Sequence, residues 1–138
     1  MVESMISIEK GPAGIFRELH AAVVAVSDLG VSRAWYEGVL GLEPRRVIEG
    51  FMAVYGTGGP THVCLYVPQP GQEKPGYQGG GSFPNWRSPD AAATHAHLSE
   101  RGVRCTDIQS SPELSWFTFY DPDGNRMDVC EYGPDWLE

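Results

Sequence analysis

The fold is decided by the stretch Trp116-Phe117-Thr118-Phe119-Tyr120-Asp121-Pro122-Asp123-Gly124-Asn125-Arg126-Met127-Asp128-Val129-Cys130. Its aromatic residues favour a strand, Asp-Pro-Asp-Gly-Asn favours a tight turn, and alternating apolar residues then favour a second strand. If Met127 and Val129 face a hydrophobic core, Asp128 and Cys130 face the other side of the sheet, because successive strand side chains alternate. The stretch therefore predicts a β-hairpin with a carboxylate and a thiol on the face opposite the core.

Two other segments, residues 27–42 and 88–103, align without a gap, and each resembles a capped helix. Each begins with a residue that caps helices and ends at a glycine suited to the left-handed position after a helix. A segment rich in proline and glycine, residues 68–84, lies between the two halves and is predicted to be a loop.

Short runs of apolar residues around each helix predict the strands. They are residues 19–26, 43–49, 51–55 and 61–67 in the first half, and 83–87, 104–108, 114–120 and 126–131 in the second. The first run is nearly all apolar, so we expect it to be buried on both faces. Each half is then a βαβββ unit. Neither unit could cover its own sheet, so two units must pair, within one chain or across a dimer.

Composition narrows the class of partner. The chain has 138 residues, 41% of them apolar, and a formal net charge of −8. A nucleic-acid partner needs a basic surface, so this class is excluded, whereas a cationic small molecule is compatible. Residues 1–5 lack the basic start of an export signal, and no apolar run reaches the length of a membrane span. Three cysteines without close pairing predict reduced thiols and a cytoplasmic protein.

The two motifs VSDLGVSRAWYEGVLGLEP (residues 26–44) and FYDPDGNRMDV (residues 119–129) resemble those of the vicinal oxygen chelate superfamily. This family holds glyoxalases, extradiol dioxygenases, fosfomycin-modifying enzymes and bleomycin-binding proteins. The resemblance implies an α+β fold in which two βαβββ modules form a curved mixed sheet around a cavity, with the helices outside. It also implies a single domain: module one at about residues 17–67, a linker at about 68–82 and module two at about 83–132.

The resemblance also implies four positions for metal ligands. They fall at Ala21, Cys64, Phe83 and Asp128, or at Gly81 in place of Phe83 if one residue is inserted. Alanine, phenylalanine and glycine side chains offer no donor atom, so we expect no cofactor. The alternative is a divalent metal held by His20, Cys64 and Asp128, with His62 as a substitute for Cys64. His20 lies one residue before its position, so it would need a β-bulge to reach the cavity.

The period of two along each strand places polar and aromatic side chains on the cavity face. The predicted ligand-binding residues are His62, Tyr66, Phe83, Asn85, Arg87, Trp116, Thr118, Asp128 and Cys130. An aromatic wall with a few polar groups suits a flat, partly apolar ligand. A buried carboxylate is costly unless it is paired, so Asp128 should meet a basic side chain, with Arg87 as the nearest candidate, or stay partly open to water. A structural carboxylate bonded to backbone or hydroxyl groups is the other possibility.

Empty metal positions on an acidic chain resemble the bleomycin-binding branch of the family. The resemblance implies a homodimeric small-molecule-binding protein that sequesters its ligand without a metal, and the ligand would be cationic or aromatic. The alternative is a metal-dependent lyase, isomerase or dioxygenase that uses His20. A third interpretation is a protein whose cavity is filled by its own side chains and which acts only through partners.

Overall fold

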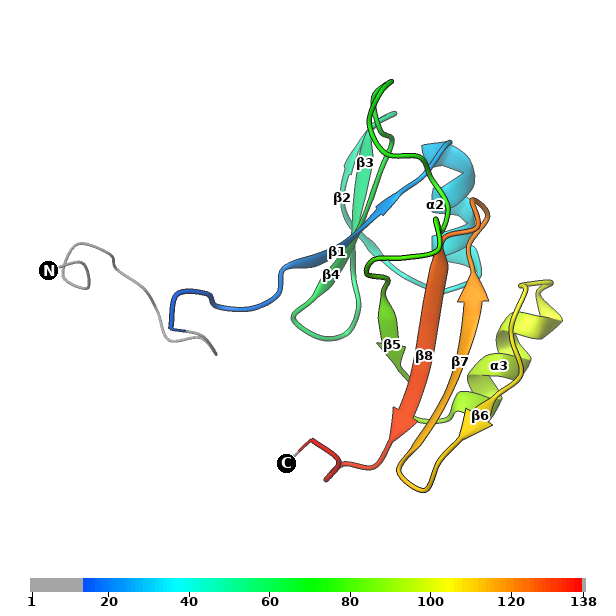
Figure 1. Cartoon of the computed structure of the whole chain (residues 1–138). Coiled ribbons are helices and arrows are strands. Elements are labelled where there is room, and N and C mark those ends of the chain that lie inside the picture. The colour runs from blue at the N-terminus through cyan, green and yellow to red at the C-terminus, as the bar shows by residue number, and fades with distance from the viewer. Residues whose placement is uncertain (1–13, 138) are drawn as a thin grey trace, which may run out of the picture.

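The computed structural model describes residues 14–137, which form two four-stranded sheets, each with one helix packed on it (Figure 1). The first half contains β1 (Ala21–Ala25), α2 (Leu29–Gly38), β2 (Pro44–Ile48), β3 (Met52–Gly56) and β4 (His62–Tyr66). The second half contains β5 (Asn85–Arg87), α3 (Ala91–Glu100), β6 (Gln109–Ser110), β7 (Leu114–Tyr120) and β8 (Arg126–Tyr132). No helix within residues 14–137 is long and apolar enough to cross a bilayer. The expectation about an export signal concerns residues outside the described part.

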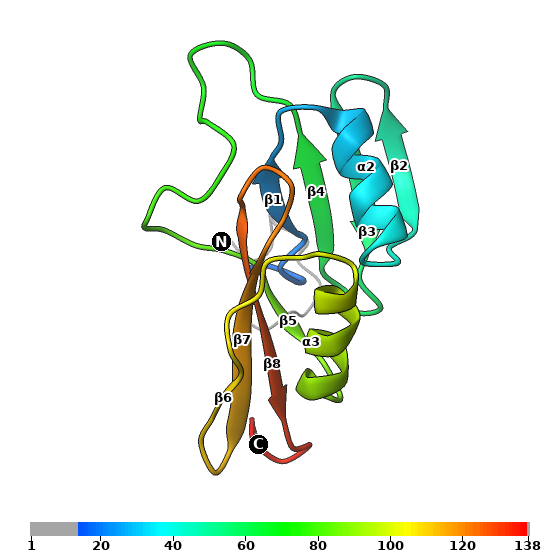
Figure 2. The same ribbon diagram turned by 90° about the vertical axis from the view of Figure 1, so that its right-hand side faces the viewer.

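The predicted α+β architecture of two βαβββ modules is confirmed. The strand orders are β1-β4-β3-β2 and β5-β8-β7-β6, and in each sheet one parallel pair joins antiparallel neighbours. The sheets remain separate rather than closing into a barrel. Figure 2 shows the first module above the second, with both helices on the same side of the molecule.

Both helices form within the segments that the sequence predicts, although α3 begins at Ala91, two residues after the expected start at Pro89. The side chains of Asp28 and Asp90 each accept a hydrogen bond of 3.0 Å from the backbone N–H three residues later. Gly41 and Gly102 follow the helices with φ angles of 70° and 78°, which favour glycine because a Cβ would be strained there.

The predicted strand at residues 104–108 is wrong apart from one isolated bridge, and the short strand β6 lies just after it. The reason is a hydroxyl group. The backbone N–H of Thr106 donates to the carbonyl of Thr118, but the return bond, from the Thr118 N–H, goes to the Thr106 side-chain Oγ1 at 2.8 Å. A side chain thus replaces the backbone acceptor, and the ladder is interrupted.

The prediction that the first strand is buried on both faces is also wrong. Val24 and Val26 lie in the core, whereas Val23 is 64% exposed. β1 lies at the edge of its sheet, and α2 covers only the face that carries Val24 and Val26. On the opposite face, Val23 stays open to solvent beside the linker, whereas Ala25 at the end of the strand is buried.

One hydrophobic core runs through both modules. Its second half contains Phe117 and Phe119 from β7 and Met127 and Val129 from β8, each at most 2% exposed. Met127 and Val129 therefore face inward as predicted, and Asp128 and Cys130 face the other side.

A buried carboxylate joins the two modules at the turn between β7 and β8. Asp121 Oδ2 accepts hydrogen bonds from Tyr36 Oη of α2 (2.6 Å) and from Asn125 Nδ2 (2.9 Å). Its Oδ1 accepts from the backbone N–H groups of Asp123 and Asn125, both at 2.9 Å. Asn125 Nδ2 also donates to the carbonyl of Ala25 at the end of β1. We call this set the Asp121 junction; it fixes the turn of module two against module one.

Replacing Asp121 by asparagine should lower the free energy of unfolding by about 1–3 kcal/mol, because an amide NH₂ would then face groups that donate to the carboxylate. Urea denaturation of Asp121→Asn measures this loss. Asp107 is exposed, so Asp107→Asn is the matched control and should change stability little. Equal stability of the two variants would contradict the role of the junction.

Tyr36 should also make stability fall at alkaline pH. Burial raises the pKa of Tyr36 well above its usual range, and the nearby Asp121 carboxylate raises it further. A phenol whose pKa is raised by folding contributes stability that is complete below its unfolded pKa of about 10 and is lost as the pH rises above it. Denaturation measured from pH 8 to 11.5 should show this loss, and the slope should be smaller in Tyr36→Phe. An unchanged slope in that variant would contradict the assignment.

Candidate functional site

The face of the second sheet that points away from α3 carries most of the predicted ligand-binding residues. Strand pairing arranges them in two rows: Asn85, Asp128 and Thr118 in one, and Arg87, Cys130 and Trp116 in the next. On the first sheet, His62, Cys64 and Tyr66 share the face that carries the exposed Val23. Both faces lie opposite their helices, as the period of two requires.

Asp128 is paired with a basic side chain, but the partner differs from the one expected. Arg126 Nε and Nη2 lie 3.0 Å and 3.2 Å from the two carboxylate oxygens, and Thr118 Oγ1 donates to Oδ1 at 2.7 Å. Arg126 precedes Asp128 by two residues on β8, so both side chains lie on one face. The expectation that Arg87 would be this partner is therefore corrected. The hydrogen bond to Asp128 raises the pKa of Arg126 above its usual range.

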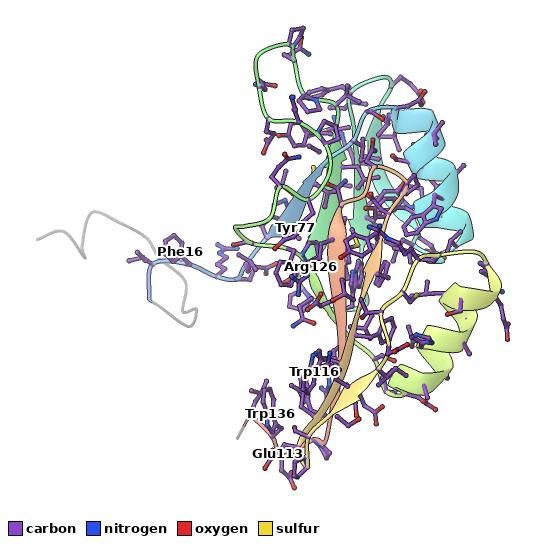
Figure 3. All side chains as sticks on the ribbon, turned by 45° about the vertical axis from the view of Figure 1, so that its right-hand side comes forward. Phe16, Tyr77, Glu113, Trp116, Arg126 and Trp136 are labelled. Carbon is purple, nitrogen blue, oxygen red and sulfur yellow. The ribbon has the colours of Figure 1, made fainter. Side chains whose placement is uncertain are left out.

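Arg126 also packs against aromatic rings. Its guanidinium carbon lies 4.0 Å from the ring centre of Phe83 and 5.5 Å from that of Tyr77. Figure 3 shows Tyr77 beside Arg126 near the start of β8, with Trp116 further along the hairpin. These contacts and the ion pair hold the Arg126–Asp128 pair in one position, so neither charge is fully available to a ligand.

Arg87 has a different environment. Its guanidinium carbon lies 4.1 Å above the ring of Tyr132, and Nη2 donates a long hydrogen bond of 3.4 Å to the Tyr132 carbonyl. Within residues 14–137, no carboxylate forms a salt bridge with it. Cys130 is its neighbour on β8: burial raises the pKa of this thiol, and the positive charge of Arg87 partly opposes the effect. Cys130 is therefore a thiol rather than a thiolate at neutral pH.

A cleft of about 860 Å³ lies between the loop that joins β3 to β4 and the strand β5. Of the predicted ligand-binding residues, four line it: His62, Phe83, Asn85 and Arg87. Tyr66, Trp116, Thr118, Asp128 and Cys130 lie outside its lining, and Thr118 is buried. The cleft has a volume in the range of small-molecule sites. We call it the β4–β5 cleft.

Sequence reasoning missed most of the residues that line this cleft. Tyr132 lines it, and extending the period of two beyond Cys130 would have found it. Trp86 and the loop at residues 57–61 also line it. No sequence signal marks the loop, because its place opposite β5 depends on how the modules pack.

A second hollow of about 410 Å³ lies under the linker. Tyr77, Gln78 and Lys74 of the linker line it together with Val23 of β1 and Arg126 of β8. It shares only the edge residues Phe83 and Pro84 with the β4–β5 cleft.

The four positions that the resemblance implies for metal ligands carry few available donor atoms. Ala21 and Phe83 carry no donor atom, Asp128 is held by Arg126, and burial raises the pKa of the Cys64 thiol, which opposes the thiolate that a metal needs. Within residues 14–137, no three His, Cys, Asp or Glu side chains gather closely enough to hold an ion.

His20 nevertheless approaches a second histidine. The ring centres of His20 and His62 lie 5.1 Å apart, and His62 Nδ1 lies 3.2 Å from the His20 carbonyl. β1 pairs regularly with β4 from its first residue, so His20 reaches this position from the end of the strand without a bulge.

Comparison with known proteins shows which solved structures share this fold. No curated protein matches the sequence. A solved member of the glyoxalase/bleomycin resistance protein/dioxygenase superfamily from Sphaerobacter thermophilus DSM 20745 is 27% identical, with a TM-score of 0.70 over 83% of this chain and 96% of that one. TnmS3, an antibiotic binding protein from Streptomyces sp. CB03234, is 24% identical, with a TM-score of 0.69 over 84% and 96%.

Another Streptomyces sp. CB03234 structure, titled a glyoxalase/bleomycin resistance protein, is 25% identical, with a TM-score of 0.66 over 81% of this chain and 98% of that one. The family model described as "Glyoxalase/Bleomycin resistance protein/Dioxygenase superfamily" matches residues 18–129, which include both helices and every strand except the last three residues of β8. This chain therefore belongs to the glyoxalase/bleomycin resistance protein/dioxygenase superfamily.

Proposed function

We propose that this protein binds a small, partly aromatic organic molecule in the β4–β5 cleft and sequesters it without a metal of its own. The observation that carries the proposal is the cleft itself, where His62, Asn85 and Arg87 offer polar groups beside the rings of Phe83 and Tyr132. Convergent polar groups on an apolar wall are typical of small-molecule sites. The similarity to TnmS3, an antibiotic binding protein, supports the same class of function.

The donor set supports metal-independent binding. Two of the four family positions lack a donor, and the Asp128 carboxylate is already neutralised by Arg126. A divalent ion needs several free oxygen, nitrogen or thiolate ligands.

We also propose a cytoplasmic location for the protein. The three cysteines are all unpaired, which supports this location.

We also propose that the protein is a homodimer. Apolar side chains on the arm before β1 and on its uncovered face are exposed to solvent: Phe16 is 62% exposed, Leu19 73% and Val23 64%. Figure 3 shows Phe16 on a segment that runs away from the sheets. Large apolar side chains left exposed on an arm and an edge strand are compatible with a protein interface. A second copy would cover it and enclose the open faces of the sheets.

The pair of His20 and His62 favours a second candidate function, a metal-dependent lyase, isomerase or dioxygenase. The pair supplies two of the nitrogen donors that such an enzyme needs. Elemental analysis of the wild type and of His20→Ala tests it. Stoichiometric metal in the wild type that is lost in the variant, with an unchanged thermal midpoint, would favour this function over ligand sequestration.

The binding site can be mapped by NMR. A library of aromatic small molecules should contain ligands that shift the amide signals of Asn85 and His62 and the indole signal of Trp86. His62→Ala should weaken these ligands about five- to tenfold, because a polar contact in the cleft is lost. His95, on the α3 side of the second sheet, gives the control His95→Ala, which should leave the affinity unchanged. Shifts confined to linker residues such as Lys74 and Gln78, or no ligand at all, would contradict the proposal.

Two valine-to-lysine substitutions, one on the proposed interface and one away from it, test the dimer. Val23→Lys should convert the dimer to a monomer in native mass spectrometry, because a charge would be buried at the interface. Val31 on α2 is 56% exposed, and Val31→Lys should leave the dimer intact. A monomeric wild type, or an intact dimer in Val23→Lys at micromolar concentration, would show that this face is not the interface.

A further inference from the structure

We propose that the β4–β5 cleft selects ligands that carry a carboxylate beside an aromatic ring, with Arg87 as the anchor for the carboxylate. This inference rests on the proposed function and adds the charge of the ligand. An anionic ligand is not expected from the composition alone, because the chain as a whole is negatively charged.

The lining of the cleft differs in charge from the rest of the molecule. The chain has 18 acidic and 10 basic residues. Of the described residues that line the β4–β5 cleft, none is aspartate or glutamate, whereas Arg87 and His62 both line it. On a protein of net charge −8, an open hollow without carboxylates is a local site for negative charge, because charges lining a cleft set its local field.

Arg87 is prepared to receive an oxyanion. Tyr132 packs against one face of its guanidinium, which orients the planar group, and among residues 14–137 Nη2 makes only the long bond of 3.4 Å to the Tyr132 carbonyl. A guanidinium has five N–H donors in a fork that matches a carboxylate in two parallel bonds. Arg126 contrasts with it, because Asp128 already takes two of the Arg126 donor atoms.

His62 and Asn85 add polar groups to the same lining. The Nδ1 atom of His62 lies 3.2 Å from the His20 carbonyl, which can only accept, so Nδ1 donates this bond and Nε2 of the neutral ring is left as an acceptor. The exposed side-chain amide of Asn85 offers further N–H donors. Phe83, Trp86 and Tyr132 supply the aromatic wall. The set therefore combines an oxyanion site with a surface for a ring.

The same geometry weakens the case for a cationic ligand. That expectation came from the acidic composition and the family resemblance, and an open Asp128 carboxylate would have supported it, but Asp128 is held by Arg126 and Thr118. A cation in the β4–β5 cleft would also approach the positive charge of Arg87. Electrostatic complementarity therefore favours an anion over a cation of the same shape.

Three probes of one shape and different charge test the proposal: 2-naphthoate, 2-naphthalenemethanol and 2-naphthylmethylammonium. Isothermal titration calorimetry at pH 7.5 and low salt should show that the naphthoate binds at least about tenfold more tightly than the alcohol and the ammonium, as expected for a charge-assisted pair with arginine. Equal affinities, or tightest binding of the ammonium, would overturn the proposal.

Variants at Arg87 locate the effect. Arg87→Ala and Arg87→Gln should both weaken the naphthoate about tenfold and leave the alcohol unchanged, while Arg87→Lys should keep part of the preference. Arg104 is the matched control: it is exposed, its guanidinium carbon stacks 3.9 Å from the ring centre of Tyr120, and it lies outside the cleft. Arg104→Ala should keep the full preference.

The outcomes separate this inference from the proposed function. Unchanged naphthoate affinity in folded Arg87→Ala and Arg87→Gln would overturn the role of Arg87. Binding of the alcohol or the ammonium with NMR shifts at Asn85, but without a preference for the naphthoate, would overturn the carboxylate and leave small-molecule binding intact. No saturable binding of any probe at millimolar concentration would contradict both.

Discussion

The buried carboxylate of Asp121 is the interaction on which the rest of the structure depends. A charge at 6% exposure must be satisfied by hydrogen bonds, and its two oxygens together accept four. Three of these bonds shape the turn between β7 and β8, and the fourth comes from Tyr36 in the other module. Because β8 pairs with β5, fixing this turn also fixes where β5 lies opposite the loop between β3 and β4. The β4–β5 cleft exists only while that arrangement holds.

Local rules predicted the elements well. The two helices, the cap at Asp28 and the inward packing of Met127 and Val129 follow from spacing alone, since neighbours along a helix or strand decide them. The strand at residues 104–108 failed because one hydroxyl, that of Thr106, took the place of a backbone acceptor. No pattern of apolar residues encodes such a choice.

The site could be predicted only in part. Period two placed Asn85, Arg87 and His62 on the correct faces, but which of them share one cleft depends on how the modules pack. The pairing of Tyr36 with Asp121 joins residues 85 positions apart, which no local rule can predict. The partner of Asp128 was Arg126 on its own strand rather than Arg87 on the next, and a stricter use of period two would have suggested it.

Membership in the superfamily establishes the fold, and the fold hosts many chemistries, so the ligand must be argued from the side chains of the cleft. Those side chains give an acidic protein a hollow lined by arginine, histidine and aromatic rings. A negative surface around such a hollow slows the approach of anions, so the affinity would have to come from short-range contacts with Arg87 rather than from steering.

A crystal structure of the protein grown with 2-naphthoate tests whether the β4–β5 cleft holds a ligand. The account predicts that the carboxylate lies within hydrogen-bond distance of the Arg87 guanidinium, that the ring lies against Phe83 or Tyr132, and that the Asp121 junction is unchanged. A cleft filled by the protein's own side chains or by those of a second copy, or a naphthoate bound only under the linker, would contradict it.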